Sequence, residues 1–175
     1  MNTLETIFTR RSVRKFNNKE ISQENIETLL KAAMSAPSAR NEQPWQFLVI
    51  NDRKILDKIP SVHEYAQMCL QAQAAIITCA NLSAYKYDDT FWVQDMSAAT
   101  QNILLAVRAL DLGAVWVGVY PNEQRINAVS KLFELPAKVI PFSIIPIGYT
   151  DALQKEVDRF QNDKVHYNKW LKKGA

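Results

Sequence analysis

The sequence predicts one domain in which helices and short strands are mixed, and three observations lead to this prediction. The chain has 175 residues, 47% of them apolar and 22% charged, which is enough apolar material for one well-filled core. Two segments with helical spacing come first, and short apolar runs then alternate with further helical segments. No repeat, low-complexity tract or linker rich in glycine and serine divides the chain.

The first fifty residues predict two helices and a strand. Asn2, with Glu5 three residues later, marks the start of a first helix. The apolar run at residues 45–50 predicts a short strand. Between them, Ser22 predicts the cap of a second helix, followed by Pro37, with an inner stripe made of Ile26, Leu29, Leu30, Ala33 and Met34.

The middle of the chain predicts broken helices, a strand and a long central helix. Residues 55–70 have helical spacing in pieces that break around Pro60, and residues 74–80 form a buried strand. Residues 91–112 are apolar on nearly every face, which predicts a helix buried all round. Gly113 is its expected C-terminal stop.

Two more strands and a helix are expected before a polar tail. Residues 114–120 predict a third strand, and Asn122 predicts the cap of a helix that ends before Pro136. Residues 139–149 predict the last strand, and two prolines in it suggest an edge or a bulge, Pro141 and Pro146. The tail after residue 150 is polar but carries aromatic residues near its end, which we expect to dock onto another surface.

Composition narrows the class of protein. A net charge of +3 and a pI near 8.8 are too mild to indicate a nucleic-acid partner. No apolar run reaches the length of a membrane span, and residues 1–7 include Glu5 and lack the apolar core of a secretory signal. Cys69 and Cys79 lie in apolar stretches, so we expect reduced core thiols in a cytoplasmic protein.

The first candidate site is a basic cluster at residues 10–14, where three arginines and a serine occur in five positions. Arginine presents a planar fork of donors that matches phosphate oxygens, and a serine hydroxyl adds another donor. The alternative interpretation is a solvated basic turn. The four glycines of the chain lack the spacing of a phosphate-binding loop, so side chains must hold any phosphate-bearing cofactor.

A second candidate is the loop at residues 36–45, whose amides and hydroxyls could contact the heteroatom edge of a planar ring. An ordinary helix-to-strand connection is the alternative. Asp95 lies in an apolar helix and needs a partner, for which we expect a structural hydrogen bond. The two histidines, His63 and His166, lie far apart without ligand or nucleophile motifs, so we expect neither a metal site nor a hydrolytic triad.

Four motifs occur in the order in which one known family carries them: RRSVRKF at 10–16, APSARNEQPW at 36–45, GAVWVGVYP at 113–121 and PIGY at 146–149. With them, the chain resembles a short member of the FMN-dependent nitroreductase family. The resemblance implies an α+β fold with three layers, in which helices flank a central mixed or antiparallel sheet. It also implies an intertwined homodimer, with residues 1–175 as one FMN-binding domain whose tail, from about residue 151, wraps the partner subunit.

The resemblance also implies where FMN binds, at the interface between the two subunits. The phosphate and ribityl end would be held by Arg10, Arg11, Ser12 and Arg159. Arg14 would reach the N1–C2 side of the ring and stabilise the reduced flavin, with no catalytic side chain besides. The N5 edge would lie beside Trp116, Val117 and Gly118. The partner subunit would line the ring with Pro37, Ser38, Ala39, Asn41 and Gln43.

The implied activity is that of a flavin oxidoreductase. NADH or NADPH would reduce the flavin, and a nitroaromatic, quinone or related small molecule would then accept the electrons in a ping-pong mechanism. The chain has little room for the helical insertion of longer members, and residues 65–68 offer no clear counterpart of their flavin-contacting lysine or asparagine. The alternatives are an FMN-dependent dehydrogenase or reductive dehalogenase with a dedicated substrate, or a non-enzymatic basic module, which lacks the expected aromatic-studded groove.

Overall fold

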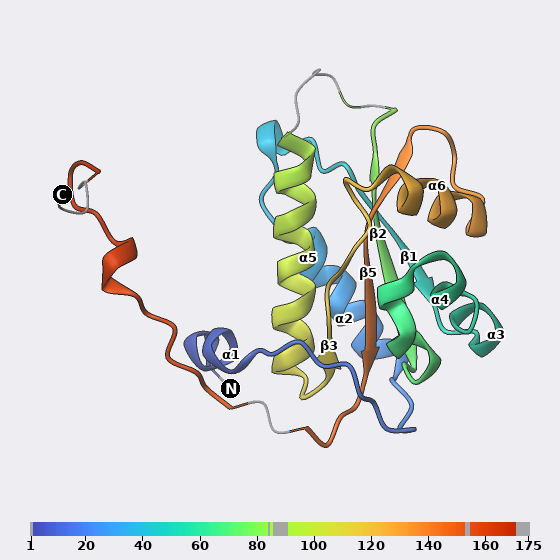
Figure 1. The fold of residues 1–175 in the computed structure, drawn as a ribbon, viewed down its shortest axis with the longest axis horizontal. Helices are drawn as coiled ribbons and strands as arrows, with labels where there is room; N and C mark the ends of the chain where they lie inside the picture. The colour runs from blue at the N-terminus through green and yellow to red at the C-terminus, as the bar shows by residue number, and fades with distance from the viewer. Residues whose placement is uncertain (1, 84, 86–90, 153–154, 171–175) are drawn as a thin grey trace.

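The computed structural model describes residues 2–83, 85, 91–152 and 155–170. A five-stranded antiparallel sheet lies between two layers of helices (Figure 1). This arrangement confirms the expected α+β fold. The strands are β1 (Trp45–Ile50), β2 (Ala74–Asn81), β3 (Gly113–Ala114), β4 (Val117–Gly118) and β5 (Val139–Gly148).

β5 is the central strand of the sheet. The order is β1-β2-β5-β3, and β4 also pairs with β5. Of the two alternatives suggested by the prolines at 139–149, the edge strand is excluded and the bulge is confirmed. The register changes from Thr78 opposite Ser143 to Cys79 opposite Pro141, so Phe142 is the extra residue. Proline has no N–H to give to the ladder, and a local slip accommodates it.

The strand expected at residues 114–120 is instead two strands of two residues each, β3 and β4, both paired with β5. Gly113 belongs to β3 rather than to the end of the preceding helix. Its lack of a side chain has a packing reason, because a Cβ there would lie 2.7 Å from Val13 Cγ1.

One face of the sheet is covered by α2 (Gln23–Met34) and α5 (Phe91–Ala109), with α1 (Thr3–Thr9) beside α5 (Figure 1). The predicted caps are confirmed: Asn2 forms a capping box with Glu5, and the Ser22 side chain accepts from Asn25 N–H. Ile26, Leu29 and Ala33 are buried as expected and Leu30 is partly buried. Met34 is 51% exposed, so its place on the inner stripe is wrong.

The long helix α5 is shorter and less buried than the sequence suggested. It ends at Ala109, and Asp111, with φ 55°, takes the left-handed conformation that was expected of a glycine. Gln94 and Gln101 are exposed, so the helix is not buried all round within one chain. Its inner face contains Asp95 together with apolar residues such as Met96 and Ile103.

The opposite face is covered by three short helical pieces and one longer helix. These are α3 (Arg53–Leu56), α4 (Ile59–Val62), the 3-10 segment η2 (Glu64–Leu70) and α6 (Glu123–Leu132). Pro60 lies in the first turn of α4 and does not break a helix, since proline is compatible with that position. The breaks come on either side of α4. Asn122 caps α6 as predicted, by accepting from Arg125 N–H.

Both faces of the central strands are buried, which explains why these strands have continuous apolar sequences. Ile76 and Ile145 pack with α2 and α5, whereas their neighbours Ile77 and Ile144 pack toward α3, α4 and α6. Cys69 and Cys79 are free and buried, as expected. Burial raises the pKa of each thiol to about 12. No helix in the described ranges is long and apolar enough to cross a membrane.

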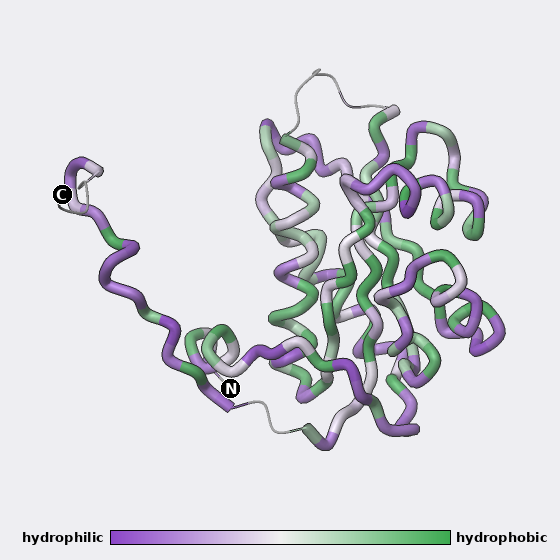
Figure 2. Tube along the Cα trace, viewed as in Figure 1, coloured by the Kyte–Doolittle hydropathy of each residue, from purple (hydrophilic) through white to green (hydrophobic). Residues whose placement is uncertain are grey.

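The tail leaves the body of the molecule after β5 and extends beyond α1 (Figure 1). It contains the short 3-10 segment η3 (Asn162–Lys164), and its His166 ring stacks on Trp170 at a centroid distance of 4.2 Å. Apolar residues are scattered among polar ones along the tail (Figure 2). Phe160, Tyr167 and Trp170 are 74%, 75% and 80% exposed. That these aromatics dock onto a partner subunit stays a prediction.

Candidate functional site

The basic segment at residues 10–14 runs in extended form beside β3. Ser12 forms a parallel bridge with Ala114, and Val13 N–H donates to Ala114 O at 2.9 Å. Val13 is buried, whereas Ser12 and Arg14 are exposed. Side chains alternate along an extended segment, so the Val13 anchor turns its two neighbours outward. The segment thereby connects two separate hollows, one at each end.

The first hollow, of about 600 Å³, lies between α1 and the tail and contains Arg10, Arg11 and Arg159. Burial, followed by the charges of Arg11 and Arg159, lowers the pKa of Arg10. Arg11 donates through Nη1 to Arg10 O at 2.6 Å, and its buried Nη2 has no hydrogen-bond partner among the described residues. Glu156 and Asp158 also line the hollow. Three guanidinium groups and an unpartnered donor fit an anion with several oxygens, such as a terminal phosphate.

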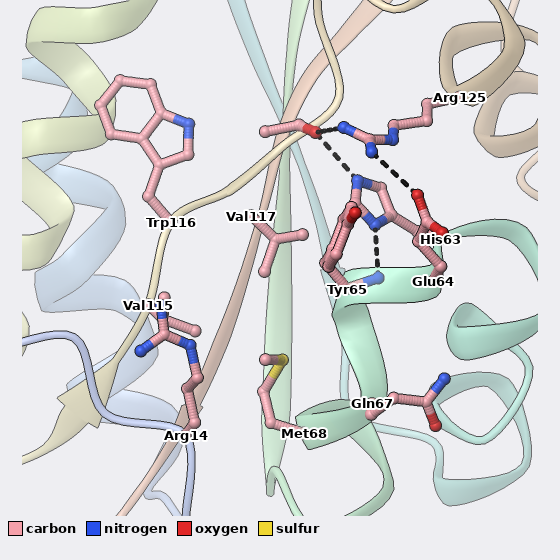
Figure 3. Close-up of a pocket in the computed structure, with 11 residues that line it drawn as sticks. Arg14, His63, Glu64, Tyr65, Gln67, Met68, Val115, Trp116, Val117 and Arg125 are labelled. Carbon is pink, nitrogen blue, oxygen red and sulfur yellow. Dashed lines mark hydrogen bonds and ion pairs between the residues drawn. The ribbon is translucent and has the colours of Figure 1, made fainter.

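The second hollow, of about 530 Å³, is a pocket beside β4, here called the ring pocket (Figure 3). Arg14 reaches it from the N-terminal segment, and residues 115–118 form one wall. Val115 and Val117 on that wall are also part of the core cluster beneath it, whereas the Trp116 indole turns away and packs against Phe142 at a centroid distance of 5.6 Å (Figure 3). The opposite wall and rim consist of His63, Glu64, Tyr65, Gln67, Met68 and Arg125.

Gly118 shows that this pocket has room for a bound ring. A Cβ built on it would meet no atom of the described residues within 4 Å, and its φ lies outside the left-handed region. Neither packing within the chain nor backbone conformation therefore requires glycine here. Glycine is also used where a ligand approaches the backbone closely. The residues present thus fit a flavin: guanidinium groups at one end of the segment, and a flat pocket with Arg14 and a bare backbone at the other.

The loop that follows α2 lines a different hollow. Arg40, Asn41 and Gln43 have left-handed φ values of 52°, 57° and 48°. Asp95 Oδ1 accepts from Ala39 N–H at 2.8 Å, which confirms the structural hydrogen bond expected of that carboxylate. This hydrogen bond helps to hold the loop, whose left-handed residues would otherwise be strained.

Within one chain this loop is apart from Arg14. Asn41 and Gln43 line a polar hollow of about 400 Å³ with Asn81 and Tyr85. Ser38 Oγ accepts from Gln43 N–H at 3.0 Å, and Pro37 is exposed at the start of the loop. The structure therefore brings Arg14 together with Trp116, Val117 and Gly118, but not with the loop. That the loop of a partner subunit lies against the ring pocket stays a prediction.

Sequence reasoning missed the wall of the ring pocket formed by η2 and α6. Gln67 and Met68 line the pocket, although no flavin-contacting counterpart was expected at 65–68. His63 is buried, 2% exposed, and its Nε2 lies 2.8 Å from Gly118 O. A local signal existed, because polar and aromatic residues follow closely after Pro60 in a segment too broken for a regular helix.

Comparison with known proteins gives consistent results. The sequence profile described as "Nitroreductase family" matches residues 7–93 and 66–149. A protein of Methanothermobacter thermautotrophicus named "Putative NADH dehydrogenase/NAD(P)H nitroreductase" is 49% identical over 170 residues, covering 97% of this chain and 88% of that protein.

Two solved structures are similar over nearly their whole length. An FMN-dependent nitroreductase from Clostridium difficile is 27% identical with a TM-score of 0.87, covering 95% of this chain and 99% of that one. A structure from Desulfovibrio desulfuricans named "putative nitroreductase in complex with fmn" is 29% identical with a TM-score of 0.82, covering 98% of this chain and 99% of that one.

Proposed function

The chain belongs to the nitroreductase family, and from this premise we propose that it passes electrons from NADH or NADPH, through bound FMN, to nitroaromatic, quinone or related small-molecule acceptors. It is an NAD(P)H-dependent flavin oxidoreductase, in keeping with the names of its relatives. We propose both the class of acceptor and the order in which donor and acceptor react. The single observation that carries it is the pairing of a triple-arginine hollow with a flat pocket along one five-residue segment.

The proposed binding residues divide into three groups. Arg10, Arg11, Ser12 and Arg159 hold the phosphate and ribityl end. Trp116, Val117 and Gly118 form the wall against the ring, with Arg14 at its edge. The group from the second subunit is Pro37, Ser38, Ala39, Asn41 and Gln43. A terminal monophosphate suits the arginine cluster, whereas the chain lacks the glycine-rich turn that cradles a pyrophosphate, so FMN is favoured over FAD.

FMN held by these residues would supply the redox chemistry, hydride transfer from the donor and electron transfer to the acceptor. Arg14 contributes a fixed positive charge at the edge of the ring pocket, which favours the more negative, reduced state of whatever lies there. The walls bind and orient flat molecules. One pocket serves donor and acceptor in turn, because two flat rings cannot occupy the same space, and turnover is therefore ping-pong.

The proposed enzyme is a homodimer built from single-domain subunits. Two features of the chain support this. The loop with left-handed residues is separate from Arg14 within one chain, and the aromatic residues of the tail are exposed. A second subunit would cover the tail and bring its loop to the ring pocket. Burial of such apolar surface typically makes the isolated subunit unstable.

The absorption spectrum of the purified protein tests the proposal. We expect yellow protein that releases FMN, not FAD, on denaturation. Colourless protein that cannot be reconstituted with FMN contradicts it. Steady-state rates with NADH and NADPH then separate this activity from that of a dehydrogenase or dehalogenase with a dedicated substrate, which would show little NAD(P)H oxidation with quinones. Parallel double-reciprocal lines for NADH against a quinone indicate ping-pong turnover, whereas intersecting lines indicate separate donor and acceptor sites.

A further inference from the structure

Two side chains converge on the carbonyl oxygen of Gly118, at the edge of the ring pocket (Figure 3). His63 Nε2 lies 2.8 Å from this oxygen, and Arg125 Nη1 lies 3.5 Å from it. His63 comes from the junction of α4 and η2, and Arg125 comes from the first turn of α6. The segment around His63, which is distant in sequence, and the nearby helix α6 therefore meet at one backbone atom of β4.

The contacts of His63 define which nitrogen carries the proton. Tyr65 N–H donates to His63 Nδ1 at 3.3 Å, so Nδ1 acts as an acceptor. A neutral imidazole has one donor and one acceptor, so the proton is on Nε2, which donates to Gly118 O. Both ring nitrogens are thus engaged with the backbone. A buried histidine in this state has no proton to give to a ligand in the pocket, and its role is to hold the backbone.

The Gly118 peptide needs such support because β4 is only two residues long. The next residue, Val119, donates its N–H to Phe142 O of β5 at 3.1 Å. Backbone groups of consecutive residues in an extended strand point to opposite edges. The N–H and C=O of Gly118 therefore point away from β5 and take no part in the strand pairing themselves, although the Val119 N–H of the same peptide group as the carbonyl does. His63 supplies the missing partner at this free edge.

We propose that His63 is a positioning residue of the ring pocket: by holding the Gly118 carbonyl, it limits the backbone freedom of Gly118 and thereby the direction of its N–H, on the preceding peptide group, which would face bound FMN. This rests on the proposed function, since FMN is the group that the N–H would meet. Arg125 supports the same carbonyl from the rim, where Glu64 Oε1 holds its Nη2 at 3.2 Å and the Tyr65 ring lies 5.1 Å from its Cζ. An N–H donor at the N5 edge would favour the oxidised flavin, in which N5 is an unprotonated acceptor, over the reduced flavin, in which N5 carries a hydrogen.

The tautomer can be tested without any substitution at this position. The chain has only two histidines, so a His166→Gln variant assigns the ¹⁵N signals of His63. We expect a neutral Nε2–H imidazole at pH 7–8, in both the FMN-free and the FMN-bound protein. An Nδ1–H tautomer, or a ring that changes tautomer freely, would overturn the proposal.

Variants test the effect on FMN. His63→Leu removes the donor, whereas His63→Gln keeps an N–H close to the Nε2 position. For His63→Leu we expect about tenfold weaker binding of oxidised FMN, the size of one lost hydrogen bond, and a midpoint potential higher by about 30 mV, which corresponds to a tenfold change for a two-electron couple. For His63→Gln both values should stay within about threefold of wild type.

A control separates positioning from general destabilisation. Thr78→Val removes a buried hydroxyl whose Oγ1 lies 2.8 Å from Ser143 Oγ, and Thr78 does not line the ring pocket. It should lower the melting temperature without changing the potential. If His63→Leu behaves like Thr78→Val, with FMN affinity and potential unchanged, His63 is merely structural. If wild-type protein binds no FMN, the proposed function itself fails, and the tautomer experiment still reports on the Gly118 clamp.

Discussion

Replacement of Gly118 by alanine distinguishes a glycine required by the fold from one required by a ligand. A Cβ at Gly118 would meet no atom of the described residues within 4 Å, and its φ is one that alanine adopts. We therefore expect Gly118→Ala to leave the FMN-free protein folded. Alanine should even stabilise it by about 0.4–1 kcal/mol, because the unfolded chain loses freedom. For a chain of this size that corresponds to a rise in melting temperature of about 1–4 °C.

FMN binding should respond in the opposite direction. A methyl group forced into a filled site typically costs about 1–3 kcal/mol, which is a rise in Kd of about 5- to 150-fold. The Kd is measured by titration of FMN fluorescence against FMN-free protein, and stability is measured by thermal melts of the same preparation. The diagnostic result is a more stable FMN-free protein with weaker FMN binding.

Gly148→Ala is the matched control. A Cβ at Gly148 would lie 2.8 Å from Phe16 Cβ and Cγ, well inside ordinary contact distance, and Phe16 does not line the ring pocket. This variant should lose about 1–3 kcal/mol of stability while the folded protein keeps its FMN affinity. Unchanged FMN affinity in Gly118→Ala would refute the reasoning, since it would mean that the ring does not approach this backbone.

Three further predictions follow from the site. Arg14→Ala should lower the midpoint potential of bound FMN by about 20–45 mV, because roughly 1–2 kcal/mol of charge stabilisation is lost, and an unchanged potential with FMN bound would place Arg14 elsewhere. Arg11→Gln should weaken binding of FMN by about tenfold or more but leave riboflavin binding unchanged, since a charge-assisted bond to phosphate is removed; equal loss for both ligands in calorimetric titrations would contradict the phosphate assignment. Asp95→Ala should cost about 1–3 kcal/mol of stability, measured by chemical unfolding, by leaving Ala39 N–H without its acceptor, whereas a neutral effect would show that the loop holds itself.

The apolar runs of β1 and β2 predicted both strands to within a residue, and in β2 the reason is burial on both faces, which leaves a continuous apolar sequence. The two strands within residues 114–120 could not be predicted, since their pairing depends on β5, which lies far along the chain. The end of α5 was misplaced because Asp111 adopts a conformation usually left to glycine. In each case the error came from a contact or backbone choice that the local pattern does not encode.

Of the residues of the candidate site, some could be predicted from the sequence and others could not. Arg14 and Gly118 were found because their motifs are contiguous in sequence, and the structure places both on the ring pocket. His63 and Arg125 were missed because they meet at Gly118 O only after η2 and α6 pack beside β4. A lone histidine and a surface arginine carry no spacing signal. Tertiary packing alone brings them together.

The two buried cysteines have a consequence for the durability of the enzyme. Quinones, one of the proposed acceptor classes, alkylate thiolates far faster than thiols. With pKa values of about 12, Cys69 and Cys79 are ionised at neutral pH to roughly one part in 10⁵. Burial and this low ionised fraction should make both thiols slow to react with electrophilic acceptors.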